Sequence, residues 1–243
     1  MRVLVLSDIH ANVEALEAVL TDAGTWDALW FLGDLVGYGP DPVACIDRIQ
    51  PLAAVALAGN HDWGVLGQVP LSAFTPAARR VLEWTREQLP ARHIEYLMGL
   101  PPQTEREGIT LTHGSLRAPI WEYILDPYTA WENIEQLPTR IGLFGHTHVA
   151  IAYHVPDRRR PQMHILEPPY DEPIDLKEGW WLLNPGSVGQ PRDGDPRAAY
   201  AILDLEAMTW TFRRVPYPIS ETQAKMRRLG FPPFLIERLA YGE

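Results

Sequence analysis

The chain has 243 residues, of which 46% are hydrophobic and 21% charged, a composition typical of a globular protein with a sizeable core. Its net charge is −10, which disfavours a nuclease or another protein that holds long nucleic acids through many Lys or Arg contacts with phosphate. The longest basic run, Arg158-Arg159-Arg160, is better explained as an exposed hairpin tip than as a phosphate-binding patch.

The cysteine content and the hydropathy of the chain indicate the cellular compartment in which the protein is expected. Cys45 is the only cysteine, so no intrachain disulfide can form and a reducing compartment is favoured. It lies on the apolar side of a helix predicted over 41–49, which indicates a buried and inert thiol. The apolar run Val3–Leu6 is too short for a signal peptide, and no stretch approaches the ~18 apolar residues of a membrane span. We therefore expect a cytoplasmic protein that makes no use of a membrane.

The first third of the chain alternates strand and helix patterns. Apolar runs at Val3–Leu6, Leu29–Leu32 and Ala53–Ala58 predict buried strands, each followed by a polar or glycine-rich turn. Helical patterns at Val13–Asp22 and Pro42–Ile49 separate them. Strand–helix alternation at this spacing predicts a parallel sheet with right-handed crossovers.

Helical insertions follow this alternating segment. Thr75 and Pro76 suit the N-cap and first position of a helix, which we expect to continue over Ala77–Gln88 and to be followed by another over Ala91–Met98. A further helix is predicted over Tyr128–Gln136.

The second half is rich in strands without helices between them. Further strands are predicted at Ile109–Thr112, Ile141–Phe144, Val149–Val155, Met163–Leu166, Trp180–Asn184, Ala198–Asp204 and Thr209–Val215. A parallel half and an antiparallel half could thus form two sheets packed face to face with helices outside. Residues 216–243 form a helical tail, which we expect to open with a capping box at Ser220-Glu221-Thr222-Gln223 and to break at Gly230–Pro233. No repeat or linker divides the chain, so one domain over 1–243 is expected.

Metal-ligand residue types follow five of the predicted strands. The segments are Asp8-Ile9-His10, Gly33-Asp34, Gly59-Asn60-His61-Asp62, Thr112-His113-Gly114 and Gly145-His146-Thr147-His148. In open α/β sheets ligands collect beyond the carboxyl ends of the strands, so these segments should converge. Each alone is an ordinary polar turn, but all five in this order indicate a metal site. Carboxylate, amide and imidazole groups suit Mn²⁺, Fe, Co²⁺ or Zn²⁺ better than Ca²⁺.

The number of ligands predicts two ions rather than one. Seven ligands exceed the needs of a single ion but serve two ions ~3.5–4 Å apart that share a carboxylate. Two divalent ions carry four positive charges, and the carboxylates of Asp8 and Asp34 offset two of them. The remaining positive charge favours deprotonation of a bound water and attracts phosphate, against the acidity of the whole chain.

The ordered motifs resemble those of the calcineurin-like metallophosphoesterase family over about residues 1–205. The segments 8–12, 33–42 and 184–192 resemble its compact bacterial and archaeal phosphodiesterase branch. The resemblance implies an α/β fold, a four-layer αββα sandwich with two mixed β-sheets and peripheral helices.

The resemblance also implies a role for each motif residue. Asp34 would bridge two divalent metal ions, with Mn²⁺ preferred and Fe, Zn, Co or Ni as alternatives. The remaining ligands divide into Asp8, His10 and His148 for the first ion and Asn60, His113 and His146 for the second. A metal-bridging hydroxide would attack phosphorus in line. His61 would stabilise the developing charge or protonate the leaving oxygen, with Asp62 orienting its ring.

Contacts with the rest of the substrate are harder to assign. Asn12, Tyr38 and Arg192 lie close in sequence to the metal loops and are candidates. Arg192 suits a bidentate phosphate contact, but it could equally pair with Asp193 or Asp195 on the surface.

The aromatic and histidine residues outside the motifs indicate function less clearly than the motif residues do. Trp121 and Tyr123 could stack on a nucleobase or an apolar leaving group, although packing in the core or in a lid is the better interpretation. The remaining histidines, which lack a motif context and are expected in the core or on the surface, are His93, His154 and His164.

The function predicted is a phosphodiesterase or phosphatase that hydrolyses a small phosphorylated substrate, possibly a nucleotide. Alternatives are a protein serine/threonine phosphatase and a non-catalytic protein-binding module on the same fold. The intact ligand set disfavours the module. The insertions 66–103 and 117–138 are expected to select the substrate, and neither their specificity nor a homo-oligomeric state can be predicted from the sequence.

Overall fold

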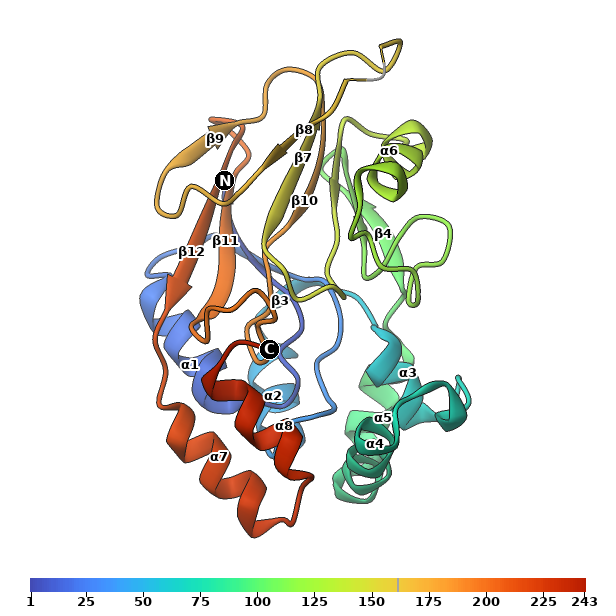
Figure 1. The fold of residues 1–243 in the computed structure, drawn as a ribbon, viewed down its shortest axis with the longest axis vertical. Helices are drawn as coiled ribbons and strands as arrows, with labels where there is room; N and C mark the ends of the chain where they lie inside the picture. Colours follow the sequence, from blue (N-terminus) through green and yellow to red (C-terminus); the bar gives the residue numbers. More distant parts are fainter. Residues whose placement is uncertain (161) are drawn as a thin grey trace.

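The computed structural model describes residues 1–160 and 162–243, and it contains two six-stranded β-sheets packed face to face (Figure 1). The strand order is β3-β2-β1-β11-β12-β9 in the first sheet and β4-β5-β6-β10-β7-β8 in the second. Helices cover the outer faces of both sheets, so the prediction of an α/β αββα sandwich with two mixed sheets is confirmed.

The first sheet takes strands from both ends of the chain. It contains β1 (Arg2–Leu6), β2 (Ala28–Phe31), β3 (Ala53–Ala56), β9 (Pro173–Asp175), β11 (Ala198–Asp204) and β12 (Thr209–Val215). β1 runs parallel to β2 and antiparallel to β11. The predicted division into a parallel half and an antiparallel half is therefore wrong. β1 is apolar on both faces and fully buried from Val3 to Leu6, so it needs a partner strand at each edge.

The second sheet has the same mixed character. It contains β4 (Gln103–Arg106), β5 (Ile109–Thr112), β6 (Ile141–Leu143), β7 (Ile151–Val155), β8 (His164–Leu166) and β10 (Trp180–Asn184). β5, β6 and β10 are parallel, while β4, β7 and β8 pair antiparallel to their neighbours. The strands that were not predicted, β4 and β9, lie at sheet edges, where exposed and proline-containing sequences are tolerated.

The predicted helices are present, with one addition. They are α1 (Val13–Asp22), α2 (Pro42–Ile49), α3 (Asn60–Leu66), α4 (Pro76–Gln88), α5 (Ala91–Met98), α6 (Pro127–Gln136), α7 (Ile219–Arg228) and α8 (Pro233–Glu237), with 3₁₀ turns at Leu71–Ala73 and Arg238–Ala240. The Thr75 hydroxyl accepts the Ala78 N–H and caps α4 as predicted. α3 was not predicted, because its first residues were interpreted as a turn. Within the described residues, none of these helices has the length and apolar character to cross a membrane.

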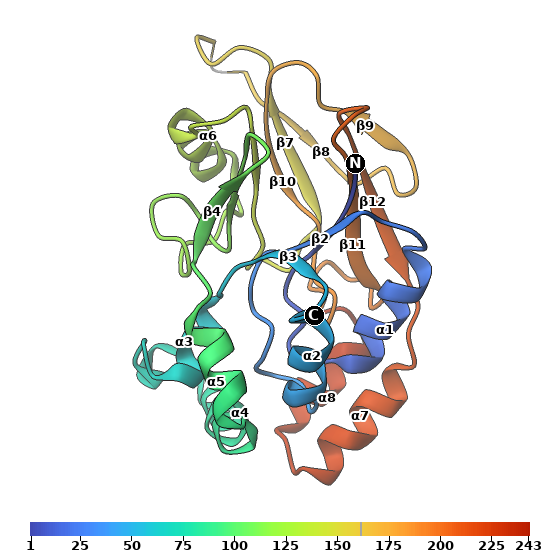
Figure 2. The same ribbon diagram turned by 180° about the vertical axis from the view of Figure 1, so that it is seen from behind.

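The expected capping box in the tail is wrong. α7 begins at Ile219 with Pro218 as its N-cap, so Ser220 lies inside the first turn. The Thr222 hydroxyl instead lies 3.1 Å from Asn12 Oδ1 and 2.9 Å from Glu14 Oε2, at the start of α1. Packing of the tail against α1, rather than a local cap, fixes the start of α7. Figure 2 shows α7 beside α1 on the outer side of the first sheet.

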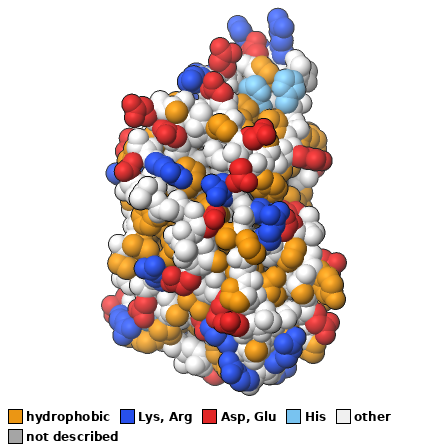
Figure 3. All heavy atoms as spheres, turned by 90° about the vertical axis from the view of Figure 1, so that its left-hand side faces the viewer, with side chains coloured by type: hydrophobic (Ala, Val, Ile, Leu, Met, Phe, Trp, Pro, Cys, Tyr) orange, Lys and Arg blue, Asp and Glu red, His pale blue; other side chains and the backbone are white. Residues whose placement is uncertain are grey.

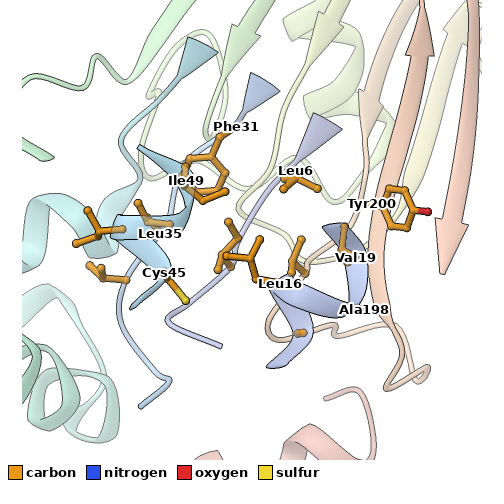
Figure 4. Close-up of a cluster of buried hydrophobic side chains, with 14 of the residues drawn as sticks. Leu6, Leu16, Val19, Phe31, Leu35, Cys45, Ile49, Ala198 and Tyr200 are labelled. Atoms are coloured by element: carbon orange, nitrogen blue, oxygen red, sulfur yellow. The ribbon is translucent and has the colours of Figure 1, made fainter. Parts of the chain in front are cut away.

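The core is layered in the same way as the fold. Residues of β1 alternate, so that Leu4 and Leu6 face the helices while Val3 and Val5 face the second sheet. Figure 4 shows the helix-facing layer, which brings Leu16 and Val19 of α1 and Cys45 and Ile49 of α2 onto the first sheet. A third layer lies between α6 and the second sheet. Outside these layers, acidic and basic side chains are interspersed over the face drawn in Figure 3.

The burial of Cys45 can be tested directly. Its side chain is fully buried, and burial raises the pKa of the thiol well above its ordinary value. We expect no reaction with a thiol reagent in the native protein and complete reaction in denaturant, measured by absorbance. Cys45→Ser should lower the free energy of unfolding by about 1–3 kcal/mol, because it buries a hydroxyl in an apolar layer. Rapid labelling of the native thiol would contradict this packing.

Candidate metal centre

The loops that follow five strands meet at one end of the two sheets. Backbone hydrogen bonds fasten them together: Asp8 N–H donates to the Gly33 carbonyl at 3.0 Å, and His10 N–H donates to the Asp34 carbonyl at 3.0 Å. Gly145 N–H donates to the His113 carbonyl at 2.8 Å. The predicted convergence of these segments is therefore present.

The carboxylate of Asp34 lies between two groups of buried side chains. Its Oδ2 atom is 3.5 Å from His10 Nε2 and 3.5 Å from His113 Nε2. In each group the ligand-type atoms lie within 4.8 Å of one another; the groups are Asp8, His10, Asp34 and His148, and Asp34, His113 and His146. Asn60 lies beside the second group, with Oδ1 3.4 Å from His113 Nε2. The structure thus places Asp34 in both groups, and the division of these residues between two ions stays a prediction.

Backbone carbonyls select the tautomer of three of the histidines. Each of these rings has Nδ1 at hydrogen-bonding distance from a carbonyl, so Nδ1 carries a proton and Nε2 is the nitrogen that can serve as a metal ligand. The pairs are His10 with Val36 at 3.1 Å, His113 with Leu32 at 2.9 Å and His148 with Gln190 at 2.6 Å.

His146 has the opposite arrangement. Its Nε2 lies 3.3 Å from the Trp121 carbonyl, which leaves Nδ1 as the free nitrogen. Its ring also stacks on Tyr123, with the ring centres 4.0 Å apart and the planes 8° from parallel. The insertion that carries Trp121 and Tyr123 therefore orients His146. The sequence offered no signal for a main-chain partner of this kind.

The donor set fits a divalent cation. His10 Nε2 and His148 Nε2 are only 3.0 Å apart, and both rings already donate from Nδ1, so two lone pairs face each other. Asp8 Oδ1, 3.3 Å from His148 Nε2, is buried without a hydrogen-bond partner among the described residues. A divalent ion held by these residues would relieve the repulsion and satisfy the carboxylate. Imidazole and carboxylate together suit Mn²⁺, Fe, Co²⁺ or Zn²⁺.

The backbone at these positions is strained. Left-handed backbone is unfavourable for residues with a Cβ atom, costing on the order of 1–3 kcal/mol each, and tends to cluster at functional sites. The residues concerned are Asp8 (φ 54°), His10 (φ 47°), Asp34 (φ 60°), His146 (φ 64°) and His148 (φ 60°). The surrounding hydrogen bonds must hold these conformations in place.

Glycines next to the ligand-type residues are required by close approach. Gly33 has φ +101°, and a Cβ atom there would lie 2.7 Å from His113 Nδ1. A Cβ atom on Gly59 would overlap the Asp34 carboxylate. This explains the Gly-Asp and Gly-Asn patterns of the two motifs.

Charges within the cluster are strongly coupled. Burial lowers the pKa of His113, but the carboxylates of Asp34 and Asp8 outweigh it and raise the value to about 9. Burial would raise the pKa of Asp34, but His113 and His61 hold it well below its ordinary range. Asp34 is therefore an ionised carboxylate in a buried site, and it attracts cations.

Asp62 has a different task from the one expected. Its carboxylate accepts backbone N–H groups from Gly59 at 2.9 Å and from residues 34–36 at 2.9, 3.0 and 3.1 Å. The prediction that it orients the ring of His61 is wrong, since its oxygens are occupied by the main chain. Burial and the Asp34 carboxylate raise the pKa of Asp62 to about 7, although the N–H groups lower it. Asp62 is thus a structural anchor for the loops after β2 and β3.

His61 lies beside the cluster as predicted. Its backbone N–H donates to Asp34 Oδ1 at 2.8 Å, and its ring contacts Tyr38 and Phe74, with centre distances of 4.3 and 5.2 Å. Burial lowers the pKa of His61 to about 4 despite the opposing charge of Asp34. Its Nδ1 lies against Gly37, so Nε2 is the ring nitrogen left for the adjoining cavity.

A cavity of about 100 Å³ adjoins both groups. It is lined by Asp34, Tyr38, Asn60, His61, Ala73, Phe74, Thr75, Ala78, Trp121, Tyr123, His146, His148 and Arg192. The residues around Phe74 and Ala78 were not singled out in the sequence, because only the fold brings α4 to the metal loops. Trp121 and Tyr123 are 37% and 45% exposed and line this cavity, so packing in the core is excluded for them, while the alternative of a lid stays a prediction.

The three candidate substrate contacts have different positions. Tyr38 and Arg192 line the cavity. Asn12 is buried as the N-cap of α1: its Oδ1 accepts the Ala15 N–H, and its Nδ2 donates to the Gly189 carbonyl at 2.9 Å. The expectation that Asn12 contacts substrate is therefore wrong, because its polar atoms already serve the fold.

Arg192 is directed to the cavity rather than to a surface ion pair. It donates to Gln190 Oε1 at 2.8 Å, and its Nε is buried without a partner among the described residues. The carboxylates considered as partners are occupied elsewhere, Asp193 by Arg214 and Asp195 by Arg197. The histidines without motif context lie outside the cluster: His93 contacts Asp47, His154 stacks on Trp181 and His164 is exposed.

Comparison with known proteins agrees with this geometry. Residues 1–208 match the family model described as the calcineurin-like phosphoesterase superfamily domain. The chain belongs to this superfamily. A solved metallophosphoesterase from Sphaerobacter thermophilus is 45% identical, with a TM-score of 0.91 over 100% of this chain and 99% of that one. The chain is accordingly a hydrolase that acts on phosphoester bonds.

Two curated relatives extend the comparison. An uncharacterized protein of Methanocaldococcus jannaschii is 34% identical over 99% of this chain and 98% of its own length. Phosphodiesterase YfcE of Escherichia coli is 26% identical over 86% of this chain and 90% of its own length. The family predicted from the five motifs is therefore confirmed.

The anchoring role of Asp62 predicts a loss of stability. Asp62→Asn removes one acceptor oxygen and turns an amide group toward backbone N–H donors. It should lower the free energy of unfolding by about 1–3 kcal/mol, measured by denaturant titration. Asp204→Asn is a matched control, since the Asp204 carboxylate also accepts two backbone N–H groups but in an exposed turn. Equal and small effects of the two substitutions would contradict the anchor.

Proposed function

We propose that this phosphoesterase uses two divalent metal ions, with Mn²⁺ preferred, and acts as a phosphodiesterase or phosphatase on small phosphorylated substrates. The position of Asp34, shared by two buried groups of ligand-type side chains, carries this proposal. The adjoining cavity of about 100 Å³ supports a small substrate. The Escherichia coli relative named as a phosphodiesterase supports the diester activity.

The geometry of the two groups supports the proposed ligand roles. Asp34 is the proposed bridge, and the other ligands are Asp8, His10 and His148 for one ion and Asn60, His113 and His146 for the other. Bound ions supply Lewis acidity for the phosphoester and for the attacking water. The carbonyl-bonded rings keep their free nitrogens aimed at the ions, so little reorganisation accompanies binding.

Two side chains of the cavity wall are proposed to act on the substrate. His61 Nε2 faces the cavity and is placed to hydrogen-bond the leaving oxygen. Arg192 presents a buried Nε without a partner among the described residues and is suited to hold a phosphoryl oxygen. The aromatic rings of Phe74, Trp121 and Tyr123 restrict water and accommodate the ester group.

The two-metal proposal predicts both metal content and activity. Protein loaded with Mn²⁺ should contain two ions per chain by elemental analysis and hydrolyse bis- or mono-p-nitrophenyl phosphate; a chelator should remove both properties. Asp34→Ala should reduce turnover by at least about a hundredfold, because the bridge matters more than an outer-shell partner. Asp175→Ala, an exposed carboxylate on the edge strand β9, is the control. The proposal would be overturned by a metal content below one ion per chain after Mn²⁺ has been added, or by a lack of turnover with every divalent metal.

Substitution of His61 should distinguish an effect on catalysis from an effect on metal binding. His61→Gln should keep two ions per chain and lower kcat by about 10²–10⁴-fold, because a positioned hydrogen-bonding group is lost from the leaving oxygen. His164→Gln, on the exposed strand β8, should leave kcat unchanged. Loss of metal in His61→Gln would show that His61 acts on the ions instead.

A further inference from the structure

Aromatic rings form a path from His61 to the mouth of the cavity. The ring centre of Phe74 lies 5.2 Å from that of His61 and 5.3 Å from that of Trp121. Phe74 is buried and Trp121 is partly exposed, so the path leads from the metal cluster toward the solvent. The two rings come from separate insertions, before α4 and before α6, on the same side of the molecule (Figures 1 and 2). Because His61 is the proposed partner of the leaving oxygen, this path lies on the side of the ester group.

The cavity is large enough for only part of an organic substrate. Its volume is about 100 Å³, whereas cavities that enclose a whole organic ligand measure roughly 300–1,000 Å³. A phosphoryl group bound beside Asp34 therefore leaves the ester group to extend to the mouth of the cavity. Trp121 and Tyr123 both line the cavity and are partly exposed, so their rings border the space into which this group extends.

The wall on this side of the cavity is largely apolar. The lining residues other than the metal cluster, His61 and Arg192 are all uncharged: Tyr38, Ala73, Phe74, Thr75, Ala78, Trp121 and Tyr123. The Thr75 hydroxyl already accepts the Ala78 N–H at the start of α4. A charged or hydroxyl-rich ester group would lose hydration here with little compensation, whereas a planar aromatic group would pack against rings.

Main-chain contacts hold Trp121 at the mouth of the cavity. Its N–H donates to the Ala118 carbonyl at 3.0 Å, and its own carbonyl lies 3.3 Å from His146 Nε2. Next to it, the carboxylate of Glu122 accepts Arg117 Nε–H at 3.0 Å. These contacts position Trp121 without using its indole side chain. The indole is therefore a preformed surface, and its replacement leaves the contact with His146 in place.

We propose that the indole of Trp121 binds an aromatic ring in the ester group of the substrate by stacking. This assignment rests on the proposed function and narrows it to phosphoesters that carry an aryl group or a nucleobase. An alkyl ester, such as phosphoserine in a protein, lacks this ring and is disfavoured. Trp121 is thus a specificity-determining residue that does not touch the reacting phosphorus.

Phosphonates, which are not hydrolysed, test this subsite by binding alone. Calorimetric titration of the Mn²⁺-loaded protein compares phenylphosphonate with methylphosphonate, which lacks the ring. The wild type should bind the phenyl compound about tenfold more tightly, the size of one aromatic stacking contact. Trp121→Ala should remove this preference, and Trp121→Phe should retain most of it.

Two controls separate the subsite from its surroundings. Tyr128→Ala removes a more exposed ring of the same insertion that is not among the residues lining the cavity, and it should keep the wild-type preference. Metal content should be unchanged in Trp121→Ala, since the main-chain carbonyl beside His146 remains. Tyr123 is unsuited to this test because its ring stacks on His146.

Rates on matched substrates distinguish the two sources of the ring. We compare kcat/KM of the wild type and Trp121→Ala for phenyl phosphate against methyl phosphate, and for adenosine monophosphate against ribose phosphate. A preference that Trp121→Ala removes in the first pair indicates an aryl ester, and one that it removes in the second pair indicates a nucleotide.

The outcomes for Trp121 and for the proposed function are distinct. Equal weakening of both phosphonates by Trp121→Ala would overturn the stacking role, because a ring that only closes the cavity affects both ligands alike. A wild type without preference for the phenyl compound, or a preference that survives in Trp121→Ala, would overturn it as well. Absence of turnover in the wild type would overturn the proposed function, while the binding preference would still decide the role of Trp121.

Discussion

The conformation of the metal loops depends on the hydrogen bonds that the Asp62 carboxylate accepts from their backbone. It accepts backbone N–H groups from Gly59 and from residues 34–36, and so fastens the loop after β2 to the start of α3. Asp34 lies in one of these segments and Asn60 in the other. The left-handed backbone at Asp34 is unfavourable unless other groups hold it in place. The Asp62 carboxylate provides that support, so the distances between the two ligand groups depend on a buried side chain that does not face the substrate.

Electrostatics make this frame a cation site rather than a polar core. Buried carboxylates and imidazole nitrogens converge on common points, and a carbonyl on the far side of each of three rings prevents the ring from turning away. In a site closed to water such groups repel one another unless positive charge lies between them. The same positive charge attracts phosphate into an acidic protein, with Arg192 and His61 on the wall of the cavity.

The described residues of the tail pack behind the loops that carry His10 and Tyr38, and none of them lines the cavity beside Asp34. Thr222 binds Asn12 behind the Asp8–His10 segment, and Leu239 packs behind Tyr38. The tail therefore supports Tyr38 from behind, while Trp121 and Tyr123 line the cavity directly. Changes in the insertion that carries Trp121 and Tyr123 would also act on the metal cluster, because this insertion orients His146.

The sequence by itself determined the family, the layered fold and the convergence of the ligand-type residues. Parallel strands end at a common edge, so residues such as Asp8 and Asp34 had to meet once their strands were recognised. Only the tertiary structure decided the anchoring role of Asp62, the capping role of Asn12, the edge strands β4 and β9, and the placement of Trp121 and Tyr123 around the cavity. The spacing of residues along the chain shows which of them come directly after the carboxyl end of a strand. It does not encode which backbone N–H or guanidinium from a distant segment comes to lie beside them, because that depends on packing between segments far apart in sequence.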